Sequence, residues 1–193
     1  MACGAYESVL PKPHVHQGDC IHVSDQVQLD ETRENFPMTS YPGPKPFSHQ
    51  ILIRFTHTDP AGYVFFPRYF EMIQAVSEEW FENCLGVNFA DMVMVQQMGQ
   101  PTAHTECQFI KPCVLGDRLD IAIILDKFGS SSLHLRFIGS VAGEIRMRAR
   151  SVQVLLDMKA SKPTAFDDNM RAHLKAYQDN VVPPDDIQPQ RRG

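Results

Sequence analysis

The sequence predicts an α+β domain in which a curved antiparallel sheet wraps around one apolar helix. Three observations indicate this class: an apolar segment of helical period between Pro67 and Gly86, a series of alternating segments after it, and short glycine-containing turns between those segments. A helix that is apolar over most of its surface needs cover on several sides, and a sheet of hairpins provides it. We therefore expect one strand, the helix, four strands and a small terminal helix, in that order.

The first strand and the helix follow from periodicity. Ile51, Ile53 and Phe55 occupy alternate positions, as they do in a strand with one apolar face. Pro67 stands where a first helical residue is favoured, and Gly86 offers a stop. The helix has a narrow polar stripe, which consists of Glu71, Glu78, Glu79 and Glu82.

Four alternating segments after the helix predict antiparallel hairpins. They span residues 103–110, 118–127, 132–141 and 144–158, with turns at 116–117, 129–130 and 142–143. In the last segment the apolar parity changes between Met147 and Val152, which predicts a bulge or bend near Arg150. Residues 166–178 are expected to form the terminal helix.

Composition places the chain among ordinary globular proteins. It has 193 residues, of which 43% are hydrophobic and 21% charged, enough for one domain with a real core. The formal net charge of -5 argues against a nucleic-acid partner. Five cysteines without a disulfide framework suit a reducing compartment, and we expect free thiols. No segment has the pattern of a secretory signal or a membrane span, so we expect a cytoplasmic location and no membrane partner.

The two ends of the chain differ from the middle. Residues 1–46 are rich in proline and polar residues and lack periodicity, so we expect a loose N-terminal extension, within which Met38 is a possible alternative start. Residues 179–193 are expected to form a flexible C-terminal tail. The compact domain is therefore expected over residues 47–178.

The segment between the first strand and the helix carries the chemistry. Asp59 lies in a short turn-rich loop, and Gly62 permits a close approach of the backbone. The loop leads into the first turn of a helix, whose N–H groups have no partners inside the helix. A carboxylate and free N–H donors at one place are suited to attack on a carbonyl group.

The residues Asp59-Pro60-Ala61-Gly62, followed by Val64, an aromatic pair, Pro67 and Tyr69, resemble the signature of the 4-hydroxybenzoyl-CoA thioesterases. In element order the resemblance covers residues 47–178. It implies the hotdog fold, hydrolysis of an acyl-CoA to the free acid and CoA with an aromatic acyl group favoured, and no metal or cofactor besides the CoA of the substrate. It also implies a homodimer or homotetramer in which subunits share the pocket.

The resemblance assigns roles to particular residues. Asp59 would attack the thioester carbonyl or activate water, and both routes stay open. The backbone N–H of Phe66 would stabilise the developing oxyanion. The residues expected to contact substrate are His57, Gly62, Tyr63 and Val64 in the loop, and Ser130, Ser131 and Ser132, whose hydroxyls would meet phosphate where the best-known family members carry a basic cluster.

Two other functions stay open. A hotdog dehydratase acting on a hydroxyacyl thioester would pair a histidine with an acid on the helix, here His57 with Glu78. A non-catalytic acyl-thioester binding module would use Asp59 only to hold the turn, a common role for aspartate.

Three further groups have ordinary structural explanations. Arg146, Arg148 and Arg150 share one strand face and are candidates for phosphate contact, although alternating arginines often mark a solvated sheet face. His104 and Glu106 share a strand face and are candidates for the pocket lining, although a cross-strand polar pair explains them as well. Cys107 and Cys113 lack a second pair of closely spaced ligands, so we expect no zinc site.

Overall fold

The computed structural model describes residues 44–182. Most of the extension expected over residues 1–46, with Met38, and most of the tail expected over 179–193 lie outside this range, so the domain limits stay predictions. The elements are β1 (Ser48–Leu52), η1 (Phe55–His57), α1 (Phe66–Leu85), α2 (Phe89–Met94), β2 (Met98–Gly99), β3 (Thr102–Phe109), β4 (Arg118–Phe128), β5 (Ser132–Val141), β6 (Glu144–Val154), β7 (Leu156–Asp157), β8 (Lys162–Pro163) and α3 (Asp168–Asn180).

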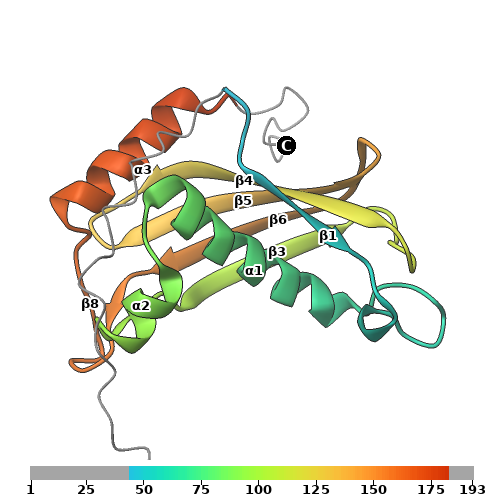
Figure 1. The fold of residues 1–193 in the computed structure, drawn as a ribbon, viewed down its shortest axis with the longest axis horizontal. Helices are drawn as coiled ribbons and strands as arrows, with labels where there is room; N and C mark the ends of the chain where they lie inside the picture. The colour runs from blue at the N-terminus through green and yellow to red at the C-terminus, as the bar shows by residue number, and fades with distance from the viewer. Residues whose placement is uncertain (1–43, 183–193) are drawn as a thin grey trace, which may run out of the picture. The chain divides into compact units, whose positions relative to one another are not determined.

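The main sheet has five antiparallel strands in the order β1-β4-β5-β6-β3, and α1 crosses one of its faces (Figure 1). The side chains of the middle strands that face α1 are buried, as expected for a core between one helix and one sheet. They include Leu119, Ile121, Ile123, Leu133, Leu135, Phe137, Met147 and Ala149. This arrangement confirms the predicted α+β class and the sheet around a central helix.

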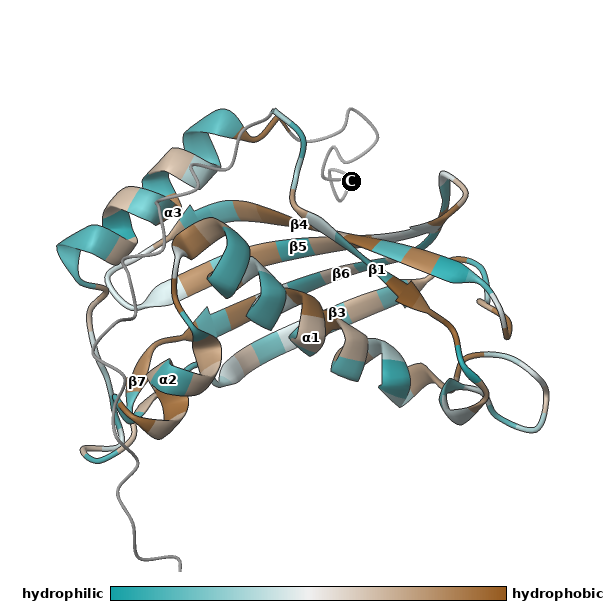
Figure 2. Cartoon of the chain, viewed as in Figure 1, coloured by the Kyte–Doolittle hydropathy of each residue, from teal (hydrophilic) through white to brown (hydrophobic). Residues whose placement is uncertain are grey.

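Helix α1 confirms the predicted apolar segment. It has 20 residues, begins with Phe66 and Pro67, and ends at Leu85; the next residue, Gly86, has a φ of 65°, the left-handed conformation that glycine adopts without strain. Trp80 and Phe81 are fully buried. Hydrophilic residues mark the side of α1 turned away from the sheet (Figure 2).

Strand β3 forms one edge of the main sheet and pairs only with β6 among the described residues. Seven of its eight residues are exposed and the eighth, Cys107, is half-buried. A long edge strand exposes a row of backbone groups that can pair with another strand.

Two predictions about strands need correction. The first strand ends at Leu52, and Phe55 lies in the short 3-10 helix with 78% of its surface exposed. The register of β6 is continuous at Arg150 itself; the register shifts lie at Arg146, against β5, and opposite residues 152–153, against β3. The inward positions of β6 continue with Ser151 and Gln153, which are buried, while Val152 faces outward; hydropathy therefore misreported which side of the strand is covered.

Some elements were not predicted. Helix α2 and the small sheet β2-β7-β8 fill the connections around the far end of α1. The terminal helix begins at Asp168, because the Asp167 side chain accepts from the Met170 N–H and caps it. In the described part of the chain, no helix combines the length and hydropathy required to cross a bilayer.

Candidate active site

The loop between β1 and α1 is held in a tight shape by its own backbone. A bridge joins Thr58 to Val64, the Asp59 N–H donates to the Tyr63 carbonyl at 2.8 Å, and the Gly62 N–H donates to the Asp59 carbonyl at 2.9 Å. Gly62 has a φ of 82°, a conformation that residues with a Cβ rarely adopt. The loop therefore presents Asp59 in a defined orientation.

The two carboxylate oxygens of Asp59 have different surroundings. Oδ1 accepts from the Ala61 N–H at 2.9 Å and, at a longer 3.4 Å, from the Tyr63 N–H. Within residues 44–182 no group is bonded to Oδ2. Asp59 thus stabilises its turn with one oxygen, as the binding-module alternative requires, and keeps the other available for chemistry.

The start of α1 offers a free donor. Pro67 has no N–H, and the Arg68 N–H donates to the Phe65 carbonyl at 2.8 Å. The Phe66 N–H has no acceptor among the described residues. It lies at the positive end of the helix dipole, where a carbonyl oxygen that gains negative charge is stabilised.

A pocket of about 320 Å³ lies beside this donor. Its lining is mostly apolar, with three aromatic residues and one cationic side chain, Lys111; the residues are Val64, Phe66, Tyr69, Phe109, Ile110, Lys111 and Pro112. A volume of this order suits a ring-sized group rather than a whole CoA thioester. Asp59 is not part of the lining; it follows Thr58, the bridge partner of Val64.

One wall of the pocket is tied to both the loop and the helix through Cys113. The Val64 N–H donates to the Cys113 carbonyl at 2.9 Å, and the Cys113 N–H donates to the Tyr69 hydroxyl at 3.2 Å. Tyr69 is 4% exposed. Burial, with the hydrogen bond to Cys113, raises the pKa of Tyr69 well above its ordinary value, so the hydroxyl stays protonated at neutral pH.

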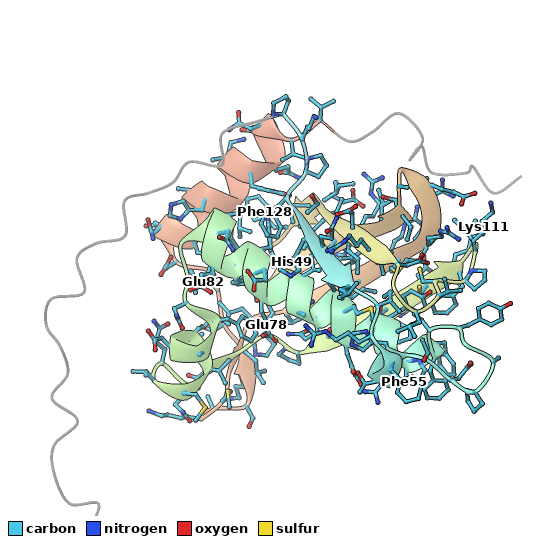
Figure 3. The ribbon with its side chains drawn as sticks, turned by 45° about the vertical axis from the view of Figure 1, so that its right-hand side comes forward. His49, Phe55, Glu78, Glu82, Lys111 and Phe128 are labelled. Atoms are coloured by element: carbon cyan, nitrogen blue, oxygen red, sulfur yellow. The ribbon has the colours of Figure 1, made fainter. Side chains whose placement is uncertain are left out.

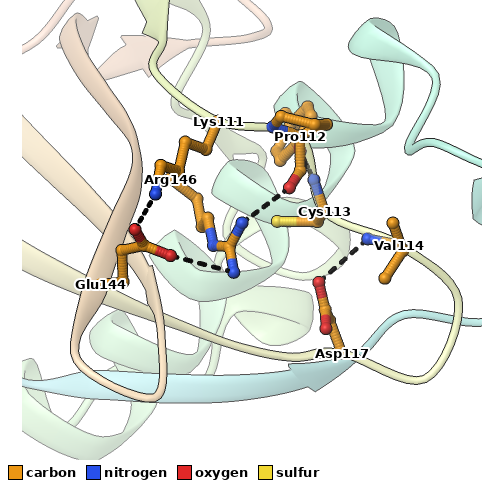
Figure 4. A network of polar contacts seen from close by, with 8 residues as sticks. Lys111, Pro112, Cys113, Val114, Asp117, Glu144 and Arg146 are labelled. Carbon is orange, nitrogen blue, oxygen red and sulfur yellow. Dashed lines mark hydrogen bonds and ion pairs between the residues drawn. The ribbon is translucent and has the colours of Figure 1, made fainter.

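A polar network lies behind the same wall (Figure 4). Arg146 donates from Nη1 to the Pro112 carbonyl at 3.0 Å, and its Nη2 lies 3.3 Å from Glu144 Oε2. Lys111 pairs with the other oxygen of Glu144. The hydrogen bond from Lys111 holds the pKa of Glu144 below its usual range, so this carboxylate is ionised.

The predicted loop residues have distinct surroundings. His57 accepts at Nδ1 from the Arg54 N–H at 3.1 Å, so this nitrogen is occupied within the loop. Val64 lines the pocket, whereas Tyr63 is 47% exposed. Gly62 shapes the turn through its backbone alone.

Residues 130–132 are not near Asp59 within one chain. They follow β4, whose 11 residues span about 35 Å from the end that pairs with Leu52 of β1. The Ser130 carbonyl instead accepts from the Phe166 N–H at 2.8 Å, beside α3. Figure 3 shows the same separation, with Phe128 far from Phe55 and Lys111. Contact of Ser130, Ser131 and Ser132 with substrate therefore stays a prediction that needs a second subunit.

The pair required by a dehydratase is not assembled within one chain either. Glu78 lies about 18 Å along α1 from Phe66, at the helical rise per residue. Its carboxylate accepts from Gln74 Nε2 at 3.0 Å. His57 belongs to the loop before the helix. For the part of the chain that the structure describes, no cluster of three residues suited to a metal ion is found.

Sequence reasoning did not find the pocket wall. Phe109, Lys111 and Pro112 lie at the end of β3 and in the connection to β4, where hydropathy gives no sign of a pocket. The acceptor role of the Tyr69 hydroxyl could not be predicted from the sequence either, because the helical pattern already explains Tyr69 as a core residue. Only the three-dimensional approach of these segments reveals the site.

Comparison with known proteins places this site in a family. Residues 53–174 match the Thioesterase-like superfamily. The 1,4-dihydroxy-2-naphthoyl-CoA hydrolase of Nostoc punctiforme is 25% identical over 124 residues, covering 64% of this chain and 83% of the relative. The enzyme of the same name from Trichodesmium erythraeum is 24% identical over 138 residues, covering 68% and 97%.

Solved structures share the fold. A Staphylococcus aureus protein determined in complex with CoA has a TM-score of 0.69 at 13% identity, covering 77% of this chain and 92% of that chain. A 1,4-dihydroxy-2-naphthoyl-CoA thioesterase from Synechocystis has a TM-score of 0.62 at 19% identity, covering 67% and 96%. A gentisyl-coenzyme A thioesterase has a TM-score of 0.61 at 20% identity, covering 65% and 99%. With the family match extending over well more than half of its length, the chain belongs to the Thioesterase-like superfamily and has the hotdog fold.

Proposed function

We propose that this protein hydrolyses an aromatic acyl-CoA thioester to the free acid and CoA, with Asp59 as nucleophile or general base. The observation that carries the proposal is the pair of free groups at the helix entrance: Oδ2 of Asp59 and the N–H of Phe66, neither of which is bonded within the described residues. One group can act on the carbonyl carbon or on water, and the other can bind the carbonyl oxygen.

Two reaction routes are open to Asp59, and in both of them the thioester and one water molecule give the free acid and CoA. In the first, Asp59 accepts a proton from water as the water oxygen bonds to the carbonyl carbon, and the tetrahedral intermediate then expels the CoA thiolate, which takes up the proton. In the second, the Asp59 oxygen itself bonds to the carbonyl carbon and displaces the thiolate, and water hydrolyses the resulting anhydride. In either case the Phe66 N–H would stabilise the oxyanion.

The lining of the pocket supports an aromatic acyl group. Phe66, Tyr69 and Phe109 present rings to a space of about 320 Å³, and aromatic rings favour one another in stacked and edge-on arrangements. The enzymes named above act on naphthoyl-CoA and gentisyl-CoA thioesters, which also have aromatic acyl groups. Among simpler candidates we favour 4-hydroxybenzoyl-CoA, in line with the resemblance of the Asp59 loop. We propose no metal and no cofactor besides the CoA of the substrate.

The edge strand supports a homodimer, and a homotetramer as its further assembly. β3 is exposed along its length, and its last residue, Phe109, lines the pocket. Pairing of β3 with β3 of a second copy would continue the sheet and close the pocket between subunits. Residues 130–132 would then contact the CoA held by the other subunit. A chain that remains monomeric and fully active in an assay over a wide range of protein concentrations would contradict this assembly.

The test is thiol release from a panel of aryl and aliphatic acyl-CoAs, comparing wild type with Asp59→Asn. Asparagine keeps an oxygen to accept from the Ala61 N–H, so the turn should persist while the carboxylate is lost. We expect kcat to fall about 100 to 10,000-fold. Asp157→Asn is a matched control, because Asp157 also accepts two backbone N–H groups at Oδ1, each at 2.9 Å, in a turn away from the site.

The outcomes separate the candidate functions. Hydrolysis of one acyl class by wild type and by Asp157→Asn, but not by Asp59→Asn, supports the proposal and identifies the class. Equal hydrolysis by all three proteins would show that Asp59 only holds its turn. Tight binding of acyl-CoA without product would favour the binding module, and hydration chemistry that depends on His57 and Glu78 would favour the dehydratase.

A further inference from the structure

We infer that Arg146 is a positioning residue: it fixes the Pro112–Cys113 wall of the pocket, and through that wall it sets the position of Val64 and Tyr69 beside the oxyanion donor. The effect on catalysis rests on the proposed function, whereas the effect on the wall does not. The sequence pattern of the three arginines on β6 did not indicate a positioning role for any of them.

Arg146 holds the wall by both its backbone and its side chain. Its carbonyl accepts from the Ile110 N–H at 2.8 Å and the Lys111 N–H at 3.2 Å. Its guanidinium donates to the Pro112 carbonyl at 3.0 Å. The side chain is only 19% exposed, so this hydrogen bond is partly shielded from competing water. Three consecutive residues of the wall are thus attached to one residue of β6.

The wall is connected directly to the catalytic loop and to α1. Cys113 follows Pro112, and its carbonyl and N–H are bonded to Val64 and to the Tyr69 hydroxyl, at 2.9 Å and 3.2 Å. Tyr63, next to Val64, forms a second bridge, to Val114. A shift of Pro112 would therefore be transmitted to the loop that leads into Phe66 and to the first turns of α1.

The two contacts of the Arg146 side chain require a guanidinium group. Arg146 reaches Pro112 and Glu144 with two different nitrogens, an arrangement that the planar fork of arginine allows and the single ammonium of lysine does not. Glu144 is ionised and also pairs with Lys111, so it orients the guanidinium from the solvent side. Arg148, two residues further along β6, has no ion pair or hydrogen bond of its side chain among residues 44–182, and so provides a matched control for the experiment without substrate.

The first experiment measures the wall without any substrate. Backbone amide hydrogen exchange of the ligand-free full chain would compare wild type, Arg146→Met and Arg148→Met. We expect the Val64 and Cys113 amides to exchange about ten times faster in Arg146→Met, since this variant loses the side-chain hydrogen bond to Pro112, the residue before Cys113, and keeps only the backbone bonds from Ile110 and Lys111. Arg148→Met should match wild type. Unchanged exchange of both amides in Arg146→Met would overturn the inference.

The second experiment measures turnover with the acyl-CoA that wild type hydrolyses best. We expect kcat to fall about tenfold or more in Arg146→Met with KM within about threefold, because the lining side chains remain while the oxyanion donor is displaced. Arg146→Lys should lose most of the same activity while folding with near-native stability, which covers the case in which the methionine variant does not fold. A kcat of the Arg146 variants equal to that of wild type would overturn the catalytic role.

The two experiments distinguish this inference from the proposed function. If wild type has no thioesterase activity, the proposed function fails, but hydrogen exchange still decides whether Arg146 fixes the wall. If activity is present and exchange at Val64 and Cys113 is unaffected by Arg146→Met, the proposed function stands and the positioning role is refuted.

Discussion

Two buried tyrosines allow the effect of the pocket on activity to be measured separately from the effect of the core on stability. Tyr69 lines the pocket, and its hydroxyl accepts from the Cys113 N–H at 3.2 Å. Tyr177, on α3, accepts from the Phe47 N–H at 3.0 Å and donates to the Ile123 carbonyl at 2.7 Å, away from the pocket. Replacing each with phenylalanine removes one hydroxyl and leaves the ring in place.

The expected stabilities follow from the partners that lose a bond. Tyr69→Phe leaves one buried N–H without its acceptor, and because the bond is long, we expect a loss of about 1 to 1.5 kcal/mol in the free energy of unfolding. Tyr177→Phe removes two hydrogen bonds of the buried hydroxyl, so we expect about 2 to 4 kcal/mol. At about 2 to 4 °C per kcal/mol for a chain of this size, the two melting temperatures should be clearly distinct.

The expected activities have the opposite order. Tyr69→Phe should lower kcat/KM about tenfold, because Cys113 and the pocket wall lose their attachment to α1. Tyr177→Phe should stay within about twofold of wild type. Urea unfolding can be followed by fluorescence of Trp80, the only tryptophan of the chain and fully buried, and turnover by thiol release. A Tyr69→Phe protein with wild-type activity, or a Tyr177→Phe protein with an equal loss, would refute this reasoning.

Three other substitutions test separate features. Phe109→Ala should raise KM for aryl-CoAs at least about fivefold more than for acetyl-CoA, because it removes a ring from the lining; equal increases in a kinetic panel would contradict an aromatic subsite. Burial raises the pKa of Cys84 from 9.0 to about 12, so the folded state keeps a proton that the unfolded chain releases, and stability should fall as pH rises from 9 towards 12. Urea titrations at pH 8 to 11 should show this slope reduced in Cys84→Ala by up to about 1.4 kcal/mol per pH unit; an unchanged slope would refute it. Asp59→Ala should be less stable than Asp59→Asn by about 1 kcal/mol in the same titrations, since only asparagine keeps the acceptor for the Ala61 N–H, and equal stabilities would contradict the role of Oδ1.

The central part of the fold could be predicted because local and global signals agree there. In α1, the helical period, Pro67 at the start and Gly86 at the end all point to the same element, which the structure confirms. The four alternating segments after it are separated from one another by turn residues. Agreement of this kind leaves few alternatives for the main sheet.

The errors arose where burial does not follow hydropathy. Ser151 and Gln153 face inward on β6 although both are polar, and Phe55 is largely exposed although it is aromatic. An alternating pattern reports only which residues prefer burial. It cannot report which side of a strand is covered by a helix.

Only part of the candidate site could be predicted from the sequence, for a related reason. The loop of Asp59 is a contiguous motif, so a sequence reveals it directly. The opposite wall comes from residues 109–113, and Arg146 reaches that wall from β6, more than thirty residues further along the chain. Such an arrangement depends on strand register, which a sequence does not specify to the residue.

Asp59 shows why the structural and the chemical explanation of a residue need not compete. The turn uses Oδ1, through the N–H groups of Ala61 and Tyr63, while Oδ2 has no partner in the described chain. Binding of N–H groups at one oxygen fixes the direction of the other, so the role in the turn orients the group that the chemistry requires. If Asp59 only held the turn, asparagine could replace it without loss of activity. If Asp59 is the nucleophile or base, asparagine cannot replace it. The loss of turnover in Asp59→Asn, at unchanged stability, therefore measures the chemical role alone.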